Sequence, residues 1–470
     1  MTHALRLCAC LAFAAATLFS APAAAESGRF SDGVALGDAG IDLRVADAIF
    51  RSDGRWLTLG TRIAEDNSAL PYLVLREAGG AQVAAFALVP SDGRSWSARS
   101  LVDLGAGHVL VAGIDHDASF GLPQALFLVR LDAVLGVVWS RRYTHADATF
   151  EDAWLRAREG RAPLLVGGIQ PVVEGVAGDG DAFLASVDVA TGELADARML
   201  GTPEAHERGA DVIALAGGGE AVALEVRRDG TGGFEAGDGI VALADDGAIA
   251  SSHLISHPVS AGIRASALRL FEDGAGYVLA GRRTAFGPNF FYLHRLDGHL
   301  APAAERTLLP FFNAADVAPA PGGGTLLYGE ANGEVGETGT VLMHLDADLG
   351  ITLQRRYPTQ NQVFPSGAIA RGDGGLMLAL GAMREDDARV FESVHRVDAD
   401  DGEGLLCEEA SYDGFATATD TQVGELAWTP ATSPLSLVST PVTVDVEPLA
   451  REDIASCATQ DDLIFRDGFP

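Results

Sequence analysis

Cysteine is scarce in this sequence, which has only four among its 470 residues. Cys8 and Cys10 lie in an N-terminal segment that we expect to be removed, so the mature chain keeps Cys407 and Cys457. In an oxidising compartment, two such residues are most simply interpreted as one Cys407–Cys457 disulfide. Two free thiols or a pair of metal ligands are the alternative, although the paired CxxC spacing typical of zinc sites is missing.

Positive charge is also scarce. There are 33 basic against 65 acidic residues, which gives a formal net charge of −32. Nucleic acid and anionic membrane surfaces are therefore not expected as partners, because phosphate recognition needs clustered basic side chains. An acidic surface keeps an exported protein soluble and can attract cations, and solubility alone is the simpler explanation.

Long apolar runs are confined to the N-terminus. Residues 1–25 have the layout of a secretory signal peptide, with Arg6, an apolar run over 7–19 and the small residues 23–25 before Glu26. The run is too short to span a bilayer, and no later stretch reaches the roughly 20 continuous apolar residues of a spanning helix. The sequence predicts a mature protein that begins at Glu26, has no membrane span and is exported to the periplasm, the cell surface or the extracellular space.

Recognisable catalytic motifs are missing as well. The sequence has no Gly-x-Ser-x-Gly elbow, no His-Glu-x-x-His, no phosphate-binding loop and no Gly-x-Gly-x-x-Gly after a strand. This absence is weak evidence against catalysis, because a repeat protein can assemble an active site from single residues of different repeats.

The sequence is rich in one repeated pattern. A short apolar strand that ends in Gly or an equivalent residue returns seven times, and its end positions are Gly60, Gly113, Gly168, Glu225, Gly281, Gly329 and Gly381. These positions are 48 to 57 residues apart. Such a period indicates a repeat architecture.

Each repeat has the content of four strands. Its apolar segments are about 4 to 8 residues long and rich in Val, Leu, Ala and aromatic residues, which favours strands. Asp-Gly and Gly-Gly pairs between the segments allow the positive φ of tight hairpins. In the fifth repeat the pattern predicts strands at 265–271, 277–281, 290–296 and 305–309. Four antiparallel strands in about 53 residues is the size of a propeller blade.

We therefore predict an all-β fold, a seven-bladed β-propeller of four-stranded antiparallel blades over residues 26–410, present as a monomer. Closing the ring removes exposed sheet edges. The C-terminal extension, 411–470, breaks the repeat and contains one further predicted strand at 442–446. Either that strand or residues 27–45 is expected to complete the last blade, and a Cys407–Cys457 bridge would pin the extension to it.

The second repeat carries a resemblance to a known group. It reads His-Val-Leu-Val-Ala-Gly at 108–113, Phe-Leu-Val-Arg-Leu-Asp at 127–132 and Trp-Ser-Arg-Arg-Tyr at 139–143, and the fifth and sixth repeats follow it. The chain thus resembles the degenerate propeller-repeat proteins of the bacterial envelope and secretome. The resemblance implies the propeller fold but no activity, since the family shares no catalytic set. The fourth repeat departs most, with Glu225 at the glycine position.

The extreme C-terminus carries a second resemblance. Residues 462–470 read Asp-Leu-Ile-Phe-Arg-Asp-Gly-Phe-Pro, which is similar to the I-F-x-D-G-F-E tail of some proteobacterial envelope proteins, with Pro470 in place of the usual acid. The resemblance implies a sorting or processing signal. An end strand that packs on the ring is the alternative.

Acidic residues gather in the segments between the second and third strands of six repeats. They are Glu65, Asp66, Asp115, Asp117, Asp179, Asp181, Glu235, Asp238, Glu334, Glu337, Glu385, Asp386 and Asp387. Repeat geometry places these segments on one face. Calcium prefers several carboxylate oxygens, so Asp179 and Asp181 in Gly-Asp-Gly-Asp are the candidate calcium ligands, and solvated turn carboxylates are the alternative.

Basic residues recur at one position of the third strand. Arg130, Arg295, His344 and Arg396 each lie two residues before an aspartate. Because residues that recur between repeats usually belong to the scaffold, we expect these to pair with carboxylates across blades. His294 and His395 occupy the adjacent register and face the other way, too far apart for a shared metal site.

A third group of candidates lies on the predicted first strands, next to the central channel. It comprises Asp152, Arg156, Asp211, Arg269 and Asp316, which fit either an active site or the channel wall. Arg371-Gly-Asp373 spells an adhesion tripeptide, but a hairpin turn requires such residues in any case.

These observations favour an exported, non-enzymatic binding or interaction module that uses a propeller face or the channel mouth. Carbohydrates, peptides and envelope proteins are the expected ligands, and no organic cofactor is expected. The alternative is a secreted hydrolase or lyase with paired carboxylates near the channel. Quinone-dependent propellers are set aside because their tryptophan docking pattern is not evident.

Overall fold

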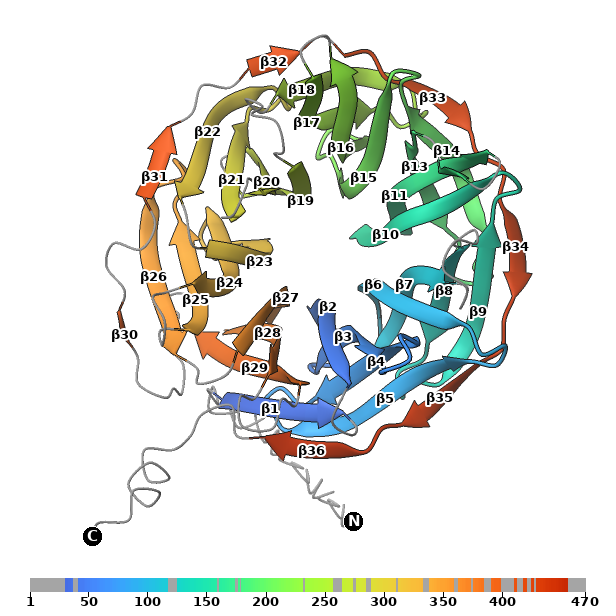
Figure 1. Cartoon of the computed structure of the whole chain (residues 1–470), viewed down its shortest axis with the longest axis vertical. Coiled ribbons are helices and arrows are strands. Elements are labelled where there is room, and N and C mark those ends of the chain that lie inside the picture. Colours follow the sequence, from blue (N-terminus) through green and yellow to red (C-terminus); the bar gives the residue numbers. More distant parts are fainter. Residues whose placement is uncertain are drawn as a thin grey trace, which may run out of the picture.

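The computed structural model describes residues 30–36, 41–116, 125–158, 160–173, 176–177, 179–230, 233–256, 264–273, 276–284, 289–309, 312–332, 338–358, 362–372, 375–383, 390–398, 410–411, 417–420, 424–426 and 428–454. These ranges form seven antiparallel sheets around a ring and contain no helix (Figure 1). The predicted seven-bladed all-β propeller is confirmed. No helix long and apolar enough to cross a membrane occurs in the described ranges.

Each blade is a meander whose first strand lies at the centre of the ring. Blade 1 contains β2 (Asp42–Phe50), β3 (Trp56–Ile63), β4 (Ala69–Arg76) and β5 (Gln82–Pro90). Blade 2 contains β6 (Ser95–Gly105), β7 (His108–His116), β8 (Ala125–Leu131) and β9 (Val137–Thr144). Blade 3 contains β10 (Ala148–Arg158), β11 (Arg161–Val173), β13 (Asp181–Val187) and β14 (Leu194–Gly201), and β12 (Val176–Ala177) extends the β11 hairpin.

The remaining blades follow the same plan. Blade 4 contains β15 (Ala205–Ala214), β16 (Glu220–Gly230), β17 (Gly233–Leu243) and β18 (Ile249–Ser256). Blade 5 contains β19 (Arg264–Glu272), β20 (Tyr277–Thr284), β21 (Asn289–Leu296) and β22 (Pro302–Leu309), close to the strands predicted for the fifth repeat. Blade 6 contains β23 (Phe312–Pro319), β24 (Thr325–Asn332), β25 (Thr338–Leu345) and β26 (Ile351–Pro358), and blade 7 contains β27 (Gln362–Gly372), β28 (Gly375–Met383) and β29 (Val390–Asp398).

The glycine of the repeat makes room for an aromatic ring. Gly60 pairs with Tyr72 across the β3–β4 ladder, and Gly281 pairs with Tyr292 across β20–β21. A Cβ at either glycine would collide with the tyrosine ring opposite. The recurring glycine is therefore required by close packing inside the blade. Between blades, apolar side chains of adjacent sheets form shared cores, such as the one that joins blades 2 and 3.

The N-terminus closes the ring. β1 (Phe30–Leu36) pairs with β29 as the fourth strand of blade 7, so the second of the two expected closures is the one observed. The seam between blades 7 and 1 also contains a buried polar contact. The Thr58 hydroxyl donates to Glu392 Oε1 at 2.9 Å, and Arg76 Nη2 lies 3.6 Å from the same oxygen. Burial raises the pKa of Glu392.

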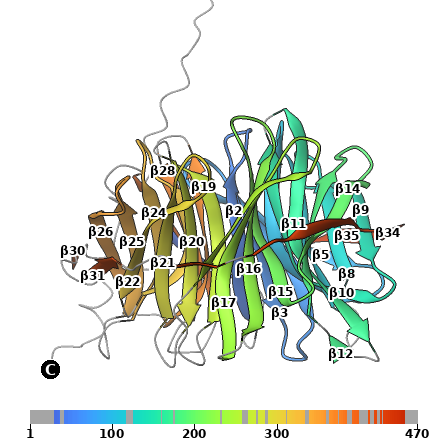
Figure 2. The same cartoon turned by 90° about the horizontal axis from the view of Figure 1, so that it is seen from above.

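The C-terminal extension forms an outer belt, which the sequence did not predict. Its strands are β30 (Ala410–Ser411), β31 (Thr417–Asp420), β32 (Gly424–Leu426), β33 (Ala431–Pro434), β34 (Val438–Pro441), β35 (Val444–Pro448) and β36 (Arg451–Ile454). They pair in turn with blades 6, 5, 4, 3, 2, 1 and 7, so the belt runs around the ring in the direction opposite to the blades (Figure 1). Figure 2 shows the belt crossing the sides of the blades. The expected strand at 442–446 corresponds to β35, which pairs with blade 1 instead of completing blade 7.

Apolar side chains of the described belt residues pack on the blade cores, and Leu437, Val442, Val446 and Leu449 are partly buried there. Leu435 and Val444 are buried, and the Trp428 indole N–H donates to Glu207 Oε1 at 3.3 Å. Most described side chains of β33 to β35 are exposed. Backbone pairing with the belt covers the outermost edge of every blade.

Three of the four recurring basic side chains bridge adjacent blades, through backbone carbonyls instead of the expected carboxylates. The fourth, His344, lies 3.4 Å from the carbonyl of Gly323 in its own blade. Arg130 donates to the backbone carbonyl of Val189 at 2.8 Å, and Arg396 donates to that of Ala78 at 2.6 Å. Arg295 reaches the carbonyl of Ala347 in the same way and also contacts Asp273 in its own blade. These acceptors lie in the turn before the fourth strand of the next blade, so the scaffold interpretation holds with a different partner.

Removal of the belt should destabilise the ring. A chain truncated after residue 409 loses all seven outer strands and leaves seven sheet edges open to water and to other chains. We expect a lower thermal midpoint and concentration-dependent association, measured by calorimetry and light scattering under reducing conditions. A chain truncated after residue 454 keeps every belt strand and is the matched control. Equal midpoints for the two truncations would show that the belt contributes nothing to stability.

Cys407 and Cys457 lie outside the described residues, so their disulfide stays a prediction. Cys407 precedes β30 by three residues and Cys457 follows β36 by three, on the neighbouring blades 6 and 7. A bridge would close the belt into a covalent loop of about 50 residues. Because the bridge reduces the entropy of the unfolded chain, it should stabilise the folded protein by about 4 kcal/mol. Non-reducing peptide mapping should find the linked pair and Cys457→Ser should lower the unfolding midpoint, whereas two free thiols would contradict the prediction.

Acid should weaken the fold through His395. This buried ring stacks on Tyr357 and contacts the Ser393 hydroxyl, and burial lowers the pKa of His395 to about 4. The unfolded chain binds the proton near pH 6.5, so this contribution to stability is present above that pH and is lost as the pH falls towards 4. The loss amounts to about 3 kcal/mol.

The measurement is the free energy of unfolding between pH 7 and pH 4, by denaturant titration. His395→Gln should flatten this part of the profile, while His299→Gln, a change at an exposed turn, should leave it as in the parent protein. Parallel profiles for the parent and His395→Gln would contradict the assignment.

Candidate functional site

The candidate site is built on a β-bulge that recurs in the innermost strand of six blades. In blades 1 to 6 the pairing of the first two strands shifts by one residue at the same level. The residue directly after the shift is polar every time, and the six are Asp47, Ser100, Asp152, Asp211, Arg269 and Asp316. A bulge bends the strand and re-aims a side chain, which here brings six polar groups to one level of the ring.

Three of these aspartates join their own blade to the next one. Asp47 accepts hydrogen bonds from the N–H of Ala48 at 2.9 Å through Oδ1 and from the N–H of Leu101 in blade 2 at 3.0 Å through Oδ2. Asp211 does the same with Val212 and Leu270, and Asp316 with Val317 and Ile369. The innermost strand has a sheet neighbour on one side only, so these carboxylates satisfy N–H groups that face the channel.

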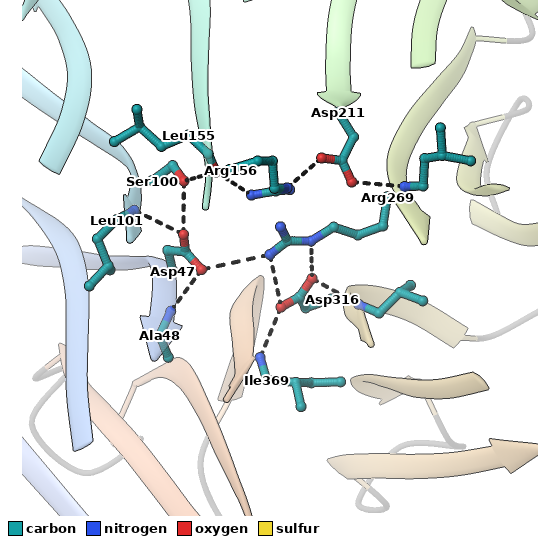
Figure 3. Close-up of polar contacts among 12 residues, drawn as sticks. Asp47, Ala48, Ser100, Leu101, Leu155, Arg156, Asp211, Arg269, Asp316 and Ile369 are labelled. Carbon is teal, nitrogen blue, oxygen red and sulfur yellow. Dashed lines mark hydrogen bonds and ion pairs between the residues drawn. The ribbon is translucent and has the colours of Figure 1, made fainter. Parts of the chain in front are cut away.

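Arg269 connects opposite sides of the ring. Its Nε lies 3.1 Å from Asp316 Oδ1 in blade 6, and its Nη2 lies 3.6 Å from Asp47 Oδ1 in blade 1 (Figure 3). Burial by itself disfavours the charge, but the carboxylates of Asp316, Asp47 and Asp211 outweigh it and keep the pKa of Arg269 above its usual range. The guanidinium therefore stays charged and draws blades 5, 6 and 1 together.

Arg156 extends this network to blades 3 and 4. Its Nε pairs with Asp211 Oδ1, and its Nη1 donates to the carbonyl of Leu155 at 2.8 Å. The Ser100 hydroxyl of blade 2 donates to Asp47 at 3.0 Å and lies 3.3 Å from the same Leu155 carbonyl. We call the set of Asp47, Ser100, Arg156, Asp211, Arg269 and Asp316 the central polar layer.

The sequence predicted four of these six residues, and the structure brings them together as part of the channel wall. Asp152, the fifth predicted residue, pairs with Arg99 at 2.9 Å on the same wall. Asp47 and Ser100 were missed. A signal existed for Asp47, because Ala46-Asp47-Ala48 repeats the pattern of Ala210-Asp211-Val212 and Ala315-Asp316-Val317.

The two faces of the ring differ. The hairpins between first and second strands define the hairpin face, and the segments between second and third strands define the loop face. A hollow of about 290 Å³ lies on the hairpin side of the central polar layer. It is lined by the last residues of four innermost strands, mainly Ile49, Phe50, Leu101, Val102 and Ile369, with Asp103 and Arg371 also present.

The two charged side chains that line the hollow, Asp103 and Arg371, differ in how they are held. Asp103 accepts hydrogen bonds from the N–H of Ser52 at 2.7 Å and of Gly105 at 3.1 Å, so its position is fixed. Arg371 is exposed at the end of β27. Asp373 of the adhesion tripeptide lies outside the described residues.

On the loop face, Asp179 is exposed and Asp181 is half-buried, with its pKa raised by burial. Nearby, the Gly180 N–H donates to His206 Nδ1 at 2.9 Å, and His206 Nε2 lies 3.2 Å from Glu151 Oε2. Glu151 raises the pKa of His206, and both ring nitrogens are engaged. In the part of the chain that is described, no group of three His, Cys, Asp or Glu side chains is arranged to hold a metal ion, and calcium at Asp179 and Asp181 stays a prediction.

The acidic segments were only partly what the sequence indicated. Asp66 is an exposed turn residue, but Asp115 is a buried strand residue that pairs with Arg142. Asp238 is also buried, where it accepts from the Tyr292 hydroxyl at 2.8 Å and lies 3.3 Å from His294. The interpretation as solvated turn carboxylates is therefore wrong for Asp115 and Asp238. Asp117, Glu334, Glu337, Glu385, Asp386 and Asp387 lie outside the described residues.

His294 is part of a buried cluster of ionisable side chains. Its Nδ1 lies 3.4 Å from Glu305 Oε2, opposite the contact with Asp238. The cluster connects β17 of blade 4 with β21 and β22 of blade 5.

Comparison with known proteins shows the fold alone. No family model and no curated protein matches this chain. Among solved structures, the NanB sialidase of Streptococcus pneumoniae is 11% identical over 78% of this chain and 70% of its own, with a TM-score of 0.38. The structure of BT0996 in an RGII complex is 8% identical over 80% of this chain and 93% of its own, with a TM-score of 0.34.

Loss of the central cation should destabilise the ring strongly. Arg269→Met leaves Asp47 and Asp316 without their shared partner, and we expect a loss of about 3 kcal/mol because a buried pair that loses one member leaves an uncompensated charge. Arg161→Met removes an exposed ion pair with Asp245 and should cost at most about 1 kcal/mol. The free energy of unfolding measures both. An equal cost for the two variants would show that the layer does not hold the ring.

Proposed function

We propose that this protein is an exported binding module that holds part of a carbohydrate or peptide chain in the hollow on its hairpin face, without converting it chemically. The observation that supports this most is the hollow itself, which is the concave site at the mouth of the channel. Its volume of about 290 Å³ lies just below the range of about 300 to 1,000 Å³ of typical ligand sites. It suits one ring or one side chain of a longer ligand.

The side chains that line the hollow favour ligand binding over catalysis. Its walls are aliphatic apart from Phe50, whose ring lies 4.4 Å from that of Trp56 in a tilted arrangement. An aromatic face and aliphatic walls suit the apolar face of a sugar or a peptide side chain. Arg371 and Asp103 supply opposite charges that would orient polar groups of the ligand.

The carboxylates nearest the channel support the same conclusion. Asp47, Asp211 and Asp316 each accept backbone N–H donors and each pairs with an arginine. A general acid or base must be able to exchange its proton with substrate. The oxygens of these carboxylates are instead engaged in hydrogen bonds and ion pairs that join the blades.

The test is a screen of glycans and peptides against the purified protein, followed by calorimetric titration of the strongest hit. Ala157 lines the hollow and is exposed, so Ala157→Trp should fill it without disturbing a core. We expect this change to weaken binding at least about tenfold. Ala195→Trp, at an exposed position on the outer strand β14, is the control and should bind like the parent. A hit whose affinity is unchanged by Ala157→Trp would place binding elsewhere.

A hydrolase or lyase is the second candidate, and Asp181 is the observation that favours it. Its raised pKa suits a general acid, and His206 and Glu151 lie nearby on the loop face. Hydrolysis or elimination on polysaccharide and peptide substrates, abolished by Asp181→Asn, would support catalysis. No turnover with any substrate class that binds in the hollow would favour the binding module.

A further inference from the structure

The outer belt contains one segment whose composition differs from the rest of the chain. Seven of the 15 residues in 429–443 are serine or threonine, and three are proline. No charged residue occurs from 426 to 444, although 21% of the whole chain is charged. We call residues 429–443 the hydroxyl arc. Exported segments that are rich in serine, threonine and proline are typical acceptors of O-linked sugars.

The hydroxyl arc lies on the outside of the ring. It contains β33, which pairs with β14 of blade 3, and β34, which pairs with β9 of blade 2 (Figure 1). All four side chains of β33 are exposed, and so are three of the four in β34. Outside these two strands, Thr429, Ser436 and Thr443 are also exposed. Hydroxyl groups along the arc are therefore accessible to a modifying enzyme.

Two of the seven hydroxyl groups hold the arc on blade 2. Ser439 Oγ accepts a hydrogen bond from Arg141 Nη1 at 2.9 Å, and Thr440 Oγ1 donates to the carbonyl of Arg142 at 3.4 Å. The hydroxyl groups of the other five make no hydrogen bond to any residue that the structure describes. These five are Thr429, Thr432, Ser433, Ser436 and Thr443. In the described structure, the five hydroxyl groups therefore contribute nothing to how the belt is held.

The hydroxyl arc also forms an open sheet edge. β33 and β34 are each the last strand of their sheet, so one side of each strand has no partner strand among the described residues. Natural proteins protect such edges with charged side chains or with proline. The belt strands β31, β32, β35 and β36 each contain a charged residue, whereas β33 and β34 contain none.

Proline gives this edge only partial protection. Pro434 and Pro441 each end a strand, but Val438 is 58% exposed between them and adds an apolar side chain to the edge. A hydrophilic sugar on the arc would supply the protection that charged side chains supply in the neighbouring belt strands.

The linkage follows from the sequence. No Asn-x-Ser or Asn-x-Thr occurs in the chain, so a sugar on the belt would be attached through a serine or threonine oxygen. In that reaction the hydroxyl oxygen forms a bond to the anomeric carbon of a glycosyl diphosphate donor. The bond from this carbon to the phosphate oxygen breaks, the diphosphate leaves with the electron pair, and the hydroxyl proton passes to a base of the transferring enzyme.

We propose that the hydroxyl arc is a site of O-linked glycosylation, at one or more of Thr429, Thr432, Ser433, Ser436 and Thr443. The sugar covers the open edge of β33 and β34 and keeps it from pairing with strands of other chains. The inference assumes export, as the proposed function does, but it is independent of the hollow and of any ligand bound there.

The test is a mass-spectrometric map of the protein purified from its own cells. No arginine or lysine lies between Arg396 and Arg451, so trypsin releases the whole hydroxyl arc in one peptide, 397–451, after reduction. We expect this peptide to be heavier than its sequence by whole sugar residues. Fragmentation that preserves the glycosidic bond should place these sugars within 429–443.

Variants connect the sugar to these residues. A chain that combines five changes should lose the extra mass, and the changes are Thr429→Ala, Thr432→Ala, Ser433→Ala, Ser436→Ala and Thr443→Ala. Ser91→Ala is the matched control. Ser91 is an exposed serine beside the belt, where its backbone N–H donates to the carbonyl of Thr443, and the change should keep the extra mass.

The covering role is tested with the unchanged sequence. Parent protein made in a host without such sugar transfer has the same edge and no sugar. We expect it to associate at lower concentration than the protein from its own cells, as measured by light scattering, because an uncharged open edge can pair with another chain.

Each result has one consequence. Sugar mass within 429–443 that the alanine variant loses and Ser91→Ala keeps supports the site. A peptide 397–451 with the mass of its sequence overturns the site, and so does sugar that lies only outside 429–443. Equal association of the two parent preparations overturns the covering role. If the alanine variant does not fold, the map of the parent decides alone, because fragmentation assigns each sugar to a residue.

Discussion

The ring depends on a carboxylate placed one residue after a β-bulge in the innermost strand. That position allows one side chain to accept an N–H of its own strand and an N–H of the adjacent blade, as Asp47, Asp211 and Asp316 do. The innermost strand of a propeller otherwise exposes unpaired backbone groups along the channel. Arg269 and Arg156 then neutralise these carboxylates, so one network satisfies both the backbone and the charges.

The outer edges of the blade sheets are covered by strands from the two ends of the chain. The N-terminal β1 completes blade 7, and the C-terminal belt adds a fifth strand to every blade. Both chain ends are therefore used for closure, and the belt crosses each blade boundary in turn. A break between two blades would have to separate the central polar layer, the shared apolar core and the belt together. This arrangement makes the seven sheets one cooperative unit rather than a row of independent repeats.

The sequence predicted the features that repeat. Local spacing predicted the glycines at 60, 113 and 281 and the strands of the fifth repeat. These features recur because the strands of every blade pack in the same way. The belt could not be predicted, because strands of two to five residues are too short to show an apolar period, and most described side chains of β33 to β35 are exposed. The buried Asp115 was misjudged because a polar residue at a strand end looks like part of a turn. Its partner Arg142 is near only in the folded blade.

The site was predicted in the same uneven way. Asp152, Arg156, Asp211, Arg269 and Asp316 were identified by their place on first strands, but their roles depend on which blades face one another across the ring. Arg269 in blade 5 reaches Asp47 in blade 1, more than 200 residues away in the chain. Single-sequence spacing cannot pair such residues. The hollow likewise combines residues from four blades.

The central claim is that the bulge carboxylates hold the blades together instead of acting on a substrate. Native-state hydrogen exchange at the amides of Leu101, Leu270 and Ile369 tests it most directly, because each donates to a carboxylate of another blade. We expect these three amides to be among the slowest to exchange and Asp316→Asn to accelerate Ile369 most. Exchange as fast as at the hairpin amides, or no effect of Asp316→Asn at Ile369, would contradict the claim.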